Sequence, residues 1–501
     1  MNFRYDPAGE CLVVKDASRI EYHQIKVWLE RHVKGYRYMP AFKMGIWSGK
    51  QSYFEDGKVR MGLWRECYKA CKEIGSTFNI ENREDFPLNR EVSIESVRDF
   101  CKEFFRNHKV RNQAGEWVPF TPYDYQIETA YRILKNRYCL ASVATSGGKS
   151  LIICIVYFYT LRNVDPDAKM LLIVPSILLV TQFYDSIMEF NYGLNFLDAW
   201  KDKVDFRDGQ VDQIRESVPD YSPCKVRMEE VMSERPRKWS GPVQPNIYIG
   251  TYQSLAKYPK EFFRQFHTVV CDEAHQSKAV TLKSILSKTF GKAYNRFGVS
   301  GTFPGDDTLE ILTIQSVLGP VITEVSANEL VKLGTITPMR IKAIIMNHDQ
   351  PELADRLAQA RKLGAGADVY RHEKEFCQSS EKRIEFIRRL VARCDKNTLL
   401  LFHTIEHGQR LFAALKEALP DKEFYYIDGE VSGTKRGEIK AELEKTQKVE
   451  YTVLNFGDFE LEVESDSKIL LSGGGWKRAT DITKEDDIDD AFLDKLRKNV
   501  A

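Results

Sequence analysis

The chain has 501 residues, of which 43% are hydrophobic and 29% charged, and its formal net charge is +1. This length predicts roughly three domains, if each takes about 150 residues. Because the charge is close to neutral, the molecule is not a polycation as a whole, and any nucleic-acid site must be a local basic patch.

The N-terminus lacks a basic segment followed by an apolar stretch, and no window approaches a membrane-spanning run of apolar residues. We therefore expect no secretory signal, no transmembrane helix and no membrane partner. The ten cysteines form no C-x-x-C pair, and Cys67 and Cys71 stand at helical spacing. That spacing favours helix core over half of a metal site, and the composition predicts a reduced, cytoplasmic setting.

Residues 1–110 are expected to form a small α+β domain at the N-terminus. Residues 31–80 contain ten Lys or Arg against four Asp or Glu, with aromatic residues interleaved among them. One interpretation is an aromatic core with solvated lysines. The other is a surface that contacts phosphates and stacks on bases. Composition alone leaves both interpretations open.

In residues 111–330, short apolar runs alternate with helical patterns. The runs lie at 139–144, 170–175, 246–251 and 268–274. Runs of this length without polar alternation predict strands buried on both faces of a parallel sheet, hence an α/β domain with ligands at the carboxyl ends of its strands. Residues 201–245 are polar and proline-rich, with basic clusters at 225–227 and 235–238. They are expected to form an insertion or an extended loop.

Residues 331–447 begin a second α/β pattern, with strand candidates at 339–345, 398–403 and 424–428. The last 54 residues, 448–501, hold thirteen acidic against eight basic residues and form a divergent acidic tail of unknown role. In this tail we expect strands at 451–456, 459–463 and 468–471, then a glycine turn and an acidic helix.

Residues 144–150 read Ala-Thr-Ser-Gly-Gly-Lys-Ser between a strand-like run and a helical one. This is the context of a phosphate-binding loop, in which glycines let backbone N–H groups close around phosphate oxygens at the start of a helix. Lys149 would reach the β- and γ-phosphates of ATP, and the Ser150 hydroxyl would bind Mg²⁺. The full pattern has glycine where Val143 stands, so a plain glycine turn is the alternative. The residues expected around the nucleotide are Thr145, Ser146, Gly147, Gly148, Lys149 and Ser150.

Asp272-Glu273-Ala274-His275 follows the apolar residues 268–271 directly. A carboxylate at the end of a buried strand can hold Mg²⁺ through water, which is the role expected of Asp272. Glu273 is placed to orient or deprotonate the attacking water, and His275 to couple the γ-phosphate to nucleic-acid contacts. Solvated acids at a strand end are the alternative, but the phosphate loop upstream argues against it.

Two weaker signals accompany these motifs. Ser300, Gly301 and Thr302 follow the strand-like residues 297–299, where small hydroxyl residues suit a link between a nucleotide site and a nucleic-acid site. Gln126 can hydrogen-bond the adenine edge while an aromatic residue such as Tyr123 stacks on the ring. Either signal, taken alone, is weak.

Together the motifs resemble superfamily 2 helicases of the DEAH-box type, and within them the phage recombination helicases of the UvsW type. The resemblance covers roughly residues 20–445. Its motifs are 123–126 (Q motif), 144–150 (I), 174–176 with Gln182 (Ia), 250–254 (Ib), 272–275 (II) and 300–302 (III). Residues 399–403, 426–430 and Arg436 resemble the start of the second motor domain, and 35–38 with 47–50 resemble the nucleic-acid-binding domain of the phage group.

The resemblance implies tandem RecA-like domains, at 111–330 and 331–447, that clasp ATP and Mg²⁺. It implies that the chain unwinds or translocates on branched DNA in recombination, repair, fork or R-loop remodelling, in the host cytoplasm if a phage encodes it. Ser300, Gly301 and Thr302 would couple hydrolysis to movement. The residues that would contact nucleic acid are Pro175, Ser176, Gln182, Thr251, Gln253, Lys43, Trp47 and Lys50.

Motifs V and VI of the family are not found after Thr446, so the second RecA-like domain is expected to be incomplete or diverged. Motif VI supplies an arginine to the γ-phosphate, whereas only Arg478 and Arg497 follow Thr446 in this chain. Two functions therefore remain open: an active helicase, or an ATP- and DNA-binding protein with weak turnover, such as one part of a split helicase that needs a partner chain with the lost motifs. A restriction-type translocase subunit is a third option, without any nuclease or methylase signature to support it.

Overall fold

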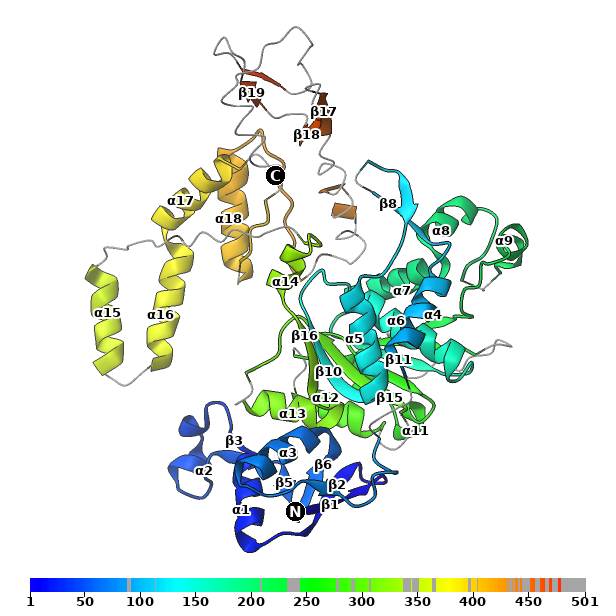
Figure 1. The fold of residues 1–501 in the computed structure, drawn as a ribbon. Helices are drawn as coiled ribbons and strands as arrows, with labels where there is room; N and C mark the ends of the chain where they lie inside the picture. Colours follow the sequence, from blue (N-terminus) through cyan, green and yellow to red (C-terminus); the bar gives the residue numbers. More distant parts are fainter. Residues whose placement is uncertain are drawn as a thin grey trace. The chain divides into compact units, whose positions relative to one another are not determined.

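The computed structural model divides into two compact units, Met1–Ile341 and Lys342–Ala501, which are described one at a time (Figure 1). The described residues are 1–87, 92–112, 114–207, 210–231, 244–275, 279–289, 293–305, 308–336, 344, 351–362, 366–394, 398–402, 404–429, 431, 435, 438–439, 442–443, 451–455, 460–464, 468–470 and 476–478. Within these ranges, no helix is long and apolar enough to cross a membrane.

A parallel seven-stranded sheet forms the centre of the first unit (Figure 1). Its order is β12-β13-β11-β14-β15-β10-β16, and every neighbouring pair is parallel. The strands are β10 (Tyr138–Val143), β11 (Met170–Val174), β12 (Met228–Val231), β13 (Ile247–Thr251), β14 (Thr268–Cys271), β15 (Asn295–Ser300) and β16 (Val321–Val325). The four apolar runs predicted to be buried strands form β10, β11, β13 and β14, so the predicted α/β fold is confirmed.

Alternate side chains of the central strands enter two separate cores. In β10, Cys139, Ala141 and Val143 pack with α4 to α7, whereas Leu140 packs with α10 to α13. Successive side chains of a strand point to opposite faces, so helices cover both faces of the sheet and explain why its strands carry no polar alternation. These helices are α4 (Ile94–Phe104), α5 (Asp124–Asn136), α6 (Lys149–Asn163), α7 (Ile177–Tyr192), α10 (Tyr252–Ala256), α11 (Lys260–Phe263), α12 (Ala279–Ser287) and α13 (Leu309–Leu318).

The helix that begins at the phosphate loop, α6, is apolar all round. Its residues 151–161 are all buried, because α5 and α7 flank it and the sheet lies beneath it. A helix without a polar face belongs in the interior of a domain. The start of α6 is thereby held firmly in the core.

Residues 201–245, predicted to be an insertion or a loop, contribute α9 (Asp212–Ser217) and the edge strand β12. The chain between them is tied to the domain by Asn191, whose side chain donates to Cys224 O at 3.0 Å and accepts from Cys224 N at 2.9 Å. The insertion thus extends the sheet beyond β13. The basic cluster 235–238 lies outside the described residues.

A second sheet organises the N-terminal domain, residues 1–87. Its order is β5-β6-β2-β1-β7, and α1 and α3 pack beside it around a core of its own. Cys67 and Cys71 are buried on α3, which confirms the helix-core prediction, and burial raises the pKa of both thiols. The elements are β1 (Asn2–Asp6), β2 (Cys11–Asp16), α1 (Arg19–Trp28), β3 (Glu30–His32), η1 (Tyr36–Tyr38), α2 (Pro40–Lys43), β4 (Lys50–Ser52), β5 (Phe54–Glu55), β6 (Lys58–Arg60), η2 (Met61–Leu63), α3 (Trp64–Glu73) and β7 (Asn79–Ile80).

Residues up to Phe86 pack in the core of the N-terminal domain, and residues from Val97 pack in the core of the next domain. The boundary between the two domains therefore comes earlier than the boundary expected at residue 110. Helix α4 contributes Val97 and Phe100 to the core shared with α5 and α6. The hairpin of β8 (Lys109–Arg111) and β9 (Trp117–Pro119) follows it. Residues 92–110 therefore pack as part of the domain that holds the phosphate loop.

The N-terminal domain is docked against α13 and the central sheet. Arg65 Nη1 donates to Val321 O at 2.9 Å, and the hydroxyls of Tyr53 and Thr313 share a hydrogen bond. The η2 turn approaches α13 so closely that a Cβ on Gly62 would lie 2.1 Å from Gln315 O. The two parts of the first unit therefore share one continuous interface.

Within its described residues, the second unit contains four longer helices and two hairpins. They are α15 (Pro351–Lys362), α16 (Gly366–Ser379), α17 (Glu381–Ala392), α18 (Ile405–Ala418), β17 (Tyr451–Asn455) with β18 (Glu460–Glu464), and β19 (Lys468–Leu470) with β20 (Trp476–Arg478). The three strands predicted in the tail are confirmed, and the predicted acidic helix lies outside the described residues.

Two strand predictions in the second unit are wrong for the residues that the structure describes. Residues 398–402 and 424–428 belong to neither a strand nor a helix, and Leu399 and Leu401 are 83% and 81% exposed. An apolar run becomes a strand only when neighbouring strands satisfy its backbone groups, and a sequence pattern does not reveal whether they do. The third candidate, 339–345, falls outside the described residues except for Ile344, as do His403, Glu430 and Arg436.

Candidate nucleotide-binding site

The loop between β10 and α6 forms a concave backbone turn. Ser146 and Gly148 have positive φ angles of 65° and 77°. Such left-handed residues turn neighbouring N–H groups toward one point, which creates an anion-binding nest at the helix N-terminus. A Cβ on Gly148 would lie 2.2 Å from Gln126 Nε2, and one on Gly147 would lie 2.7 Å from Val143 Cγ1. Close packing therefore requires glycine at both positions, and at Gly148 the positive φ requires it as well.

Val143, which stands where the full motif has glycine, is buried at the end of β10. Its side chain lies beneath Gly147 and so supports the loop from the core side. The departure from the full pattern thus leaves the concave turn in place.

The phosphate loop and the Asp-Glu-Ala-His motif meet at the carboxyl edge of the sheet. Lys149 Nζ lies 3.5 Å from Glu273 Oε1. Glu273 itself has a φ of 47°, a conformation that costs a non-glycine residue about 1–3 kcal/mol and is often found at functional sites. The two motifs that carry the predicted chemistry are therefore in direct contact.

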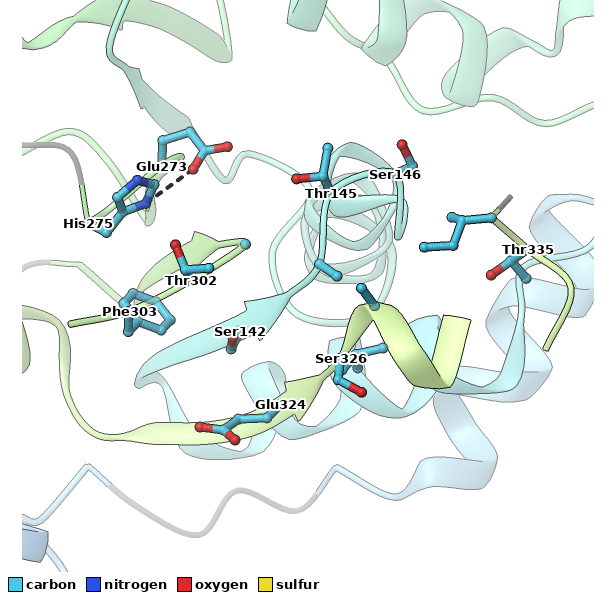
Figure 2. A pocket seen from close by; sticks show the side chains of 15 residues that line it. Ser142, Thr145, Ser146, Glu273, His275, Thr302, Phe303, Glu324, Ser326 and Thr335 are labelled. Carbon is cyan, nitrogen blue, oxygen red and sulfur yellow. Dashed lines mark ion pairs between the residues drawn. The ribbon is translucent and has the colours of Figure 1, made fainter. Parts of the chain in front are cut away.

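The contact continues through His275 to Ser300 at the end of β15. His275 Nδ1 lies 3.3 Å from Glu273 Oε2 (Figure 2) and 2.5 Å from Ser300 Oγ. The Ser300 hydroxyl donates its single proton to Thr302 O at 2.7 Å, so Nδ1 must carry the proton shared with Ser300. Lys149, Glu273, His275 and Ser300 consequently form one unbroken chain of polar contacts.

Asp272 is the most buried acid of the site, with only 3% of its surface exposed. Burial, and then the neighbouring Glu273, raise the pKa of Asp272 to about 6, although Lys149 acts in the opposite direction. Its Oδ1 atom is buried and accepts no hydrogen bond from any described residue.

The residues around Asp272 fit a bound Mg²⁺. A buried carboxylate oxygen without a donor suits a cation, and Ser150 offers a hydroxyl at the start of α6. Among the described residues, no group of three or more His, Cys, Asp or Glu is arranged so that it could hold a metal ion by itself. Mg²⁺ in nucleotide enzymes takes few protein ligands and completes its shell with phosphate and water, so a larger cluster is not required.

A cavity of about 1130 Å³ opens above the loop (Figure 2). Four of the candidate residues, Thr145, Ser146, Glu273 and His275, line it. Its volume is sufficient for a ligand with the size of a nucleotide.

One wall of this cavity was not predicted from the sequence. Ser326, Ala327, Thr335 and Ile336, around α14 (Ala327–Lys332), also line it. Leu330 of α14 is buried, and a Cβ on Gly147 would lie 3.1 Å from its Cδ1. The capping box of Ser326 and Glu329 indicates the start of a helix, but no local signal places that helix against the phosphate loop.

The side chain of Gln126 is turned toward the phosphate loop. Only 5% of Gln126 is exposed; its Oε1 accepts from Tyr123 N at 2.9 Å, and its Nε2 donates to Gly147 O at 3.3 Å. Tyr125 also donates to Gly147 O, at 3.1 Å, and its ring stacks on that of Tyr123. Tyr123 is 53% exposed and so offers a surface on which a base can stack.

The candidate nucleic-acid contacts of motifs Ia and Ib share one edge of the sheet, because β11 and β13 pair with Val174 opposite Thr251. Ser176 caps α7, and Gln182 on the same helix is exposed. Thr251 is buried and caps α10, where its side chain accepts from Ser254 N, so its hydroxyl is already engaged. The remaining candidates of these motifs are Gln253, which is exposed, and Pro175, which is half-buried.

The candidates in the N-terminal domain, Lys43, Trp47 and Lys50, lie between the start of α2 and the first residue of β4. Lys43 is exposed on α2. Trp47 Nε1 donates to Lys50 O at 2.9 Å, and Lys50 Nζ lies 3.9 Å from Glu30 Oε2. Trp47 therefore stabilises the loop that presents the lysines.

Residues 123–311 match the family model of the DEAD/DEAH box helicases. This segment is a DEAD/DEAH box helicase domain. It contains the phosphate loop, the Asp-Glu-Ala-His motif and Ser300, which are the groups joined in the polar chain. The residues that contact one another in the polar chain therefore all lie within the matched segment.

The chain is similar to the protein named ATP-dependent DNA helicase uvsW of Enterobacteria phage T4. The two are 24% identical over 465 residues, which cover 92% of this chain and 82% of the relative. A crystal structure of T4 UvsW superimposes with a TM-score of 0.49 at 20% identity, covering 88% of this chain and 77% of that one. A second crystal structure of the UvsW helicase gives the same score and identity, with 64% of this chain and 99% of that chain covered.

Proposed function

We propose that the chain is an ATP-dependent DNA helicase or translocase that acts on branched DNA. The observation that supports this best is the contact chain from Lys149 through Glu273 and His275 to Ser300. It connects a phosphate-binding loop to a strand end in a domain of the helicase family. The relative from phage T4, which bears the name of an ATP-dependent DNA helicase, supports the choice of DNA.

In this proposal the backbone of residues 144–150 holds the phosphates of ATP, and Lys149 contacts the β- and γ-phosphates. Ser150 and Asp272 hold Mg²⁺, which supplies neutralising charge to the phosphates. Glu273 orients the attacking water and takes its proton. His275 and Ser300 then link the occupied nucleotide site to Thr302 and the nucleic-acid edge.

DNA is proposed to contact two surfaces of the first unit. The first is the sheet edge with Ser176, Gln182 and Gln253, and the second is the basic segment around Lys43 of the N-terminal domain. Phosphate contacts from such groups position a duplex without reading its sequence. A role in recombination or repair, including fork or R-loop remodelling, is part of this proposal.

The test is ATP turnover by the full chain without nucleic acid and with branched DNA, single-stranded DNA or RNA. We expect branched DNA to stimulate turnover most and the Lys149→Ala variant to show none under any condition. Equal turnover with and without DNA would overturn the proposal.

A second candidate is a protein that binds ATP and DNA but turns over weakly. The sequence observation in its favour is that only Arg478 and Arg497 follow Thr446, whereas an arginine at the γ-phosphate contributes about 10³–10⁵ in rate. Arg478 ends the hairpin strand β20, and Arg497 lies outside the described residues. Tight ATP binding with slow turnover, restored by a second polypeptide carrying motifs V and VI, would support this candidate. Robust turnover that survives Arg478→Ala and Arg497→Ala would exclude it.

A further inference from the structure

Residues 31–54 of the N-terminal domain, called the tip segment below, have a single sign of charge. They contain Arg31, Lys34, Arg37, Lys43 and Lys50, and no Asp or Glu. Figure 1 shows α2, in the middle of this segment, at the outer side of the N-terminal domain. A basic surface of this kind suits a polyanion and repels a second copy of itself.

The tip segment also exposes large apolar side chains. Tyr38 is 82% exposed, Ile46 74% and Met44 65%. Isolated exposed apolar residues are ordinary on protein surfaces. Three large ones within the short, basic tip segment are unusual and suggest a binding surface. Charge and apolar surface together point to a ligand with phosphates and unstacked bases, since bases offer a flat apolar face and phosphates a negative charge.

Ring contacts inside the tip segment hold its backbone in place. The rings of His32 and Tyr36 stack at 4.2 Å, and Phe42 packs edge-on against Tyr36 at 4.8 Å. Gly49 has a φ of 76°, and a Cβ there would lie 2.3 Å from the Tyr36 ring. The backbone that carries the exposed side chains is therefore held in one conformation by these ring contacts. Binding through the exposed side chains then costs little conformational entropy.

We propose that Tyr38, Met44 and Ile46 contact the exposed bases at the junction of branched DNA while the neighbouring basic side chains hold its phosphates. The inference rests on the proposed function and deepens it, because it assigns recognition of the junction to particular residues. Apolar side chains that enter a base step unstack it, and a junction offers a step that is already open.

The test uses the full chain with the substitutions Tyr38→Ala, Met44→Ser and Ile46→Ser together. All three side chains are exposed, so the fold should survive, which circular dichroism checks. The matched control is Ile20→Ser, an equally exposed apolar residue on α1 outside the tip segment. The probe is a forked duplex with 2-aminopurine at its first paired position.

We expect the triple variant to bind the fork about 5- to 150-fold more weakly, the range for loss of one stacked base. The 2-aminopurine response and fork separation should be lost in the triple variant, whereas the Ile20→Ser control should keep both. Tyr38→Phe alone should preserve the response because the ring remains.

Wild-type fork binding, fluorescence response and separation by the folded triple variant would overturn the proposal. It would also be overturned if the substitutions abolished self-association in sedimentation without changing fork binding, since the tip would then meet a second copy of the chain. If DNA does not stimulate ATP turnover by the wild-type chain, the proposed function is refuted. Fork binding and the 2-aminopurine response do not depend on turnover, so they still test whether Tyr38, Met44 and Ile46 contact the junction.

Discussion

The Glu10 carboxylate of the N-terminal domain pairs with the Arg296 guanidinium of β15, and each side chain is only 2% exposed. Arg296 also donates to Val317 O at 2.7 Å and lies over the ring of Tyr138. Burial, the largest single effect, lowers the pKa of Arg296, but Glu10 together with Tyr138 and Tyr5 outweighs it and the pKa is raised. β15 ends at Ser300, so the N-terminal domain is anchored to the strand that completes the nucleotide site.

We predict that Arg296→Met destabilises the first unit by about 3–5 kcal/mol, because it leaves the Glu10 carboxylate buried without its cation. The double variant Glu10→Gln with Arg296→Met should lose much less, since neither buried charge remains. Denaturant unfolding of both single variants and the double variant gives the coupling energy. Strictly additive losses would mean that the pair contributes nothing as a pair.

Lys149→Ala should abolish ATP turnover and leave the fold intact, because this side chain supplies charge at the loop and not core packing. Turnover and circular dichroism of the purified variant check both halves of the prediction. Lys135→Ala on α5, which removes another partly exposed lysine of the same domain, is the control and should hydrolyse normally. Normal turnover by a folded Lys149→Ala variant would show that residues 144–150 are not the phosphate-binding loop of the ATPase site.

Glu273→Gln should lower turnover by about 10² or more, the usual contribution of a general base, while nucleotide affinity is retained. The substitution keeps the shape of the side chain, so the contact with Lys149 loses charge but not space. Equilibrium binding and turnover are measured on the same preparation. Glu128→Gln, which removes an exposed carboxylate paired with Arg132, is the control. Wild-type turnover in the variant would exclude Glu273 from the mechanism.

Asp272 leads to a prediction about pH. Its pKa is raised to about 6 from 3.8, so folding favours the protonated form. The stability contributed by this group is complete below its unfolded pKa and is lost as pH rises through about 6, at a cost of about 3 kcal/mol. Without Mg²⁺ and nucleotide, Asp272→Asn should therefore be more stable than wild type at pH 7, and the difference should shrink as pH falls toward 4. Thermal unfolding at several pH values measures it, and a difference independent of pH would show that the buried charge of Asp272 is not the cause.

Substitution of Lys34, Arg37 and Lys43 by Ala should weaken DNA binding and reduce its salt dependence. Each phosphate contact contributes about 0.9 to the slope of log affinity against log salt, so three contacts predict a fall of about 2.7. Lys15, Lys26 and Lys72, exposed in the same domain outside the tip segment, form the matched control set. Substitution is a better test than deletion of the domain, because deletion would bare the face of α13 that meets Gly62.

The parts of the site that could be predicted from sequence are those with a local signature. β10, β11, β13 and β14 were recognisable because burial on both faces leaves no polar alternation. Lys149 and Glu273 follow β10 and β14, and Ser300 ends the parallel strand β15. The carboxyl ends of parallel strands share one edge, so their proximity could also be expected.

What the sequence did not reveal depends on contacts between distant segments. Glu10 and Arg296 are 286 positions apart, and neither has a neighbour that marks it for burial. The strand β12 lies in a polar, proline-rich stretch and owes its pairing to β13, and Leu330 reaches the phosphate loop only through the fold of α14. Gln126 illustrates a different limit, because an amide can hydrogen-bond a ligand or the protein itself, and residue type does not distinguish the two.

The Glu10–Arg296 pair also has a consequence for biosynthesis. At about 5–20 residues per second, a ribosome needs about 15–60 seconds to extend the chain from Glu10 to its partner, 286 positions later. Throughout that interval the N-terminal domain has no strand β15 to dock on, and the Glu10 carboxylate stays hydrated. Docking is therefore a late step of synthesis, and any ribosome that stalls before β15 holds a nascent chain with the face around Gly62 still bare.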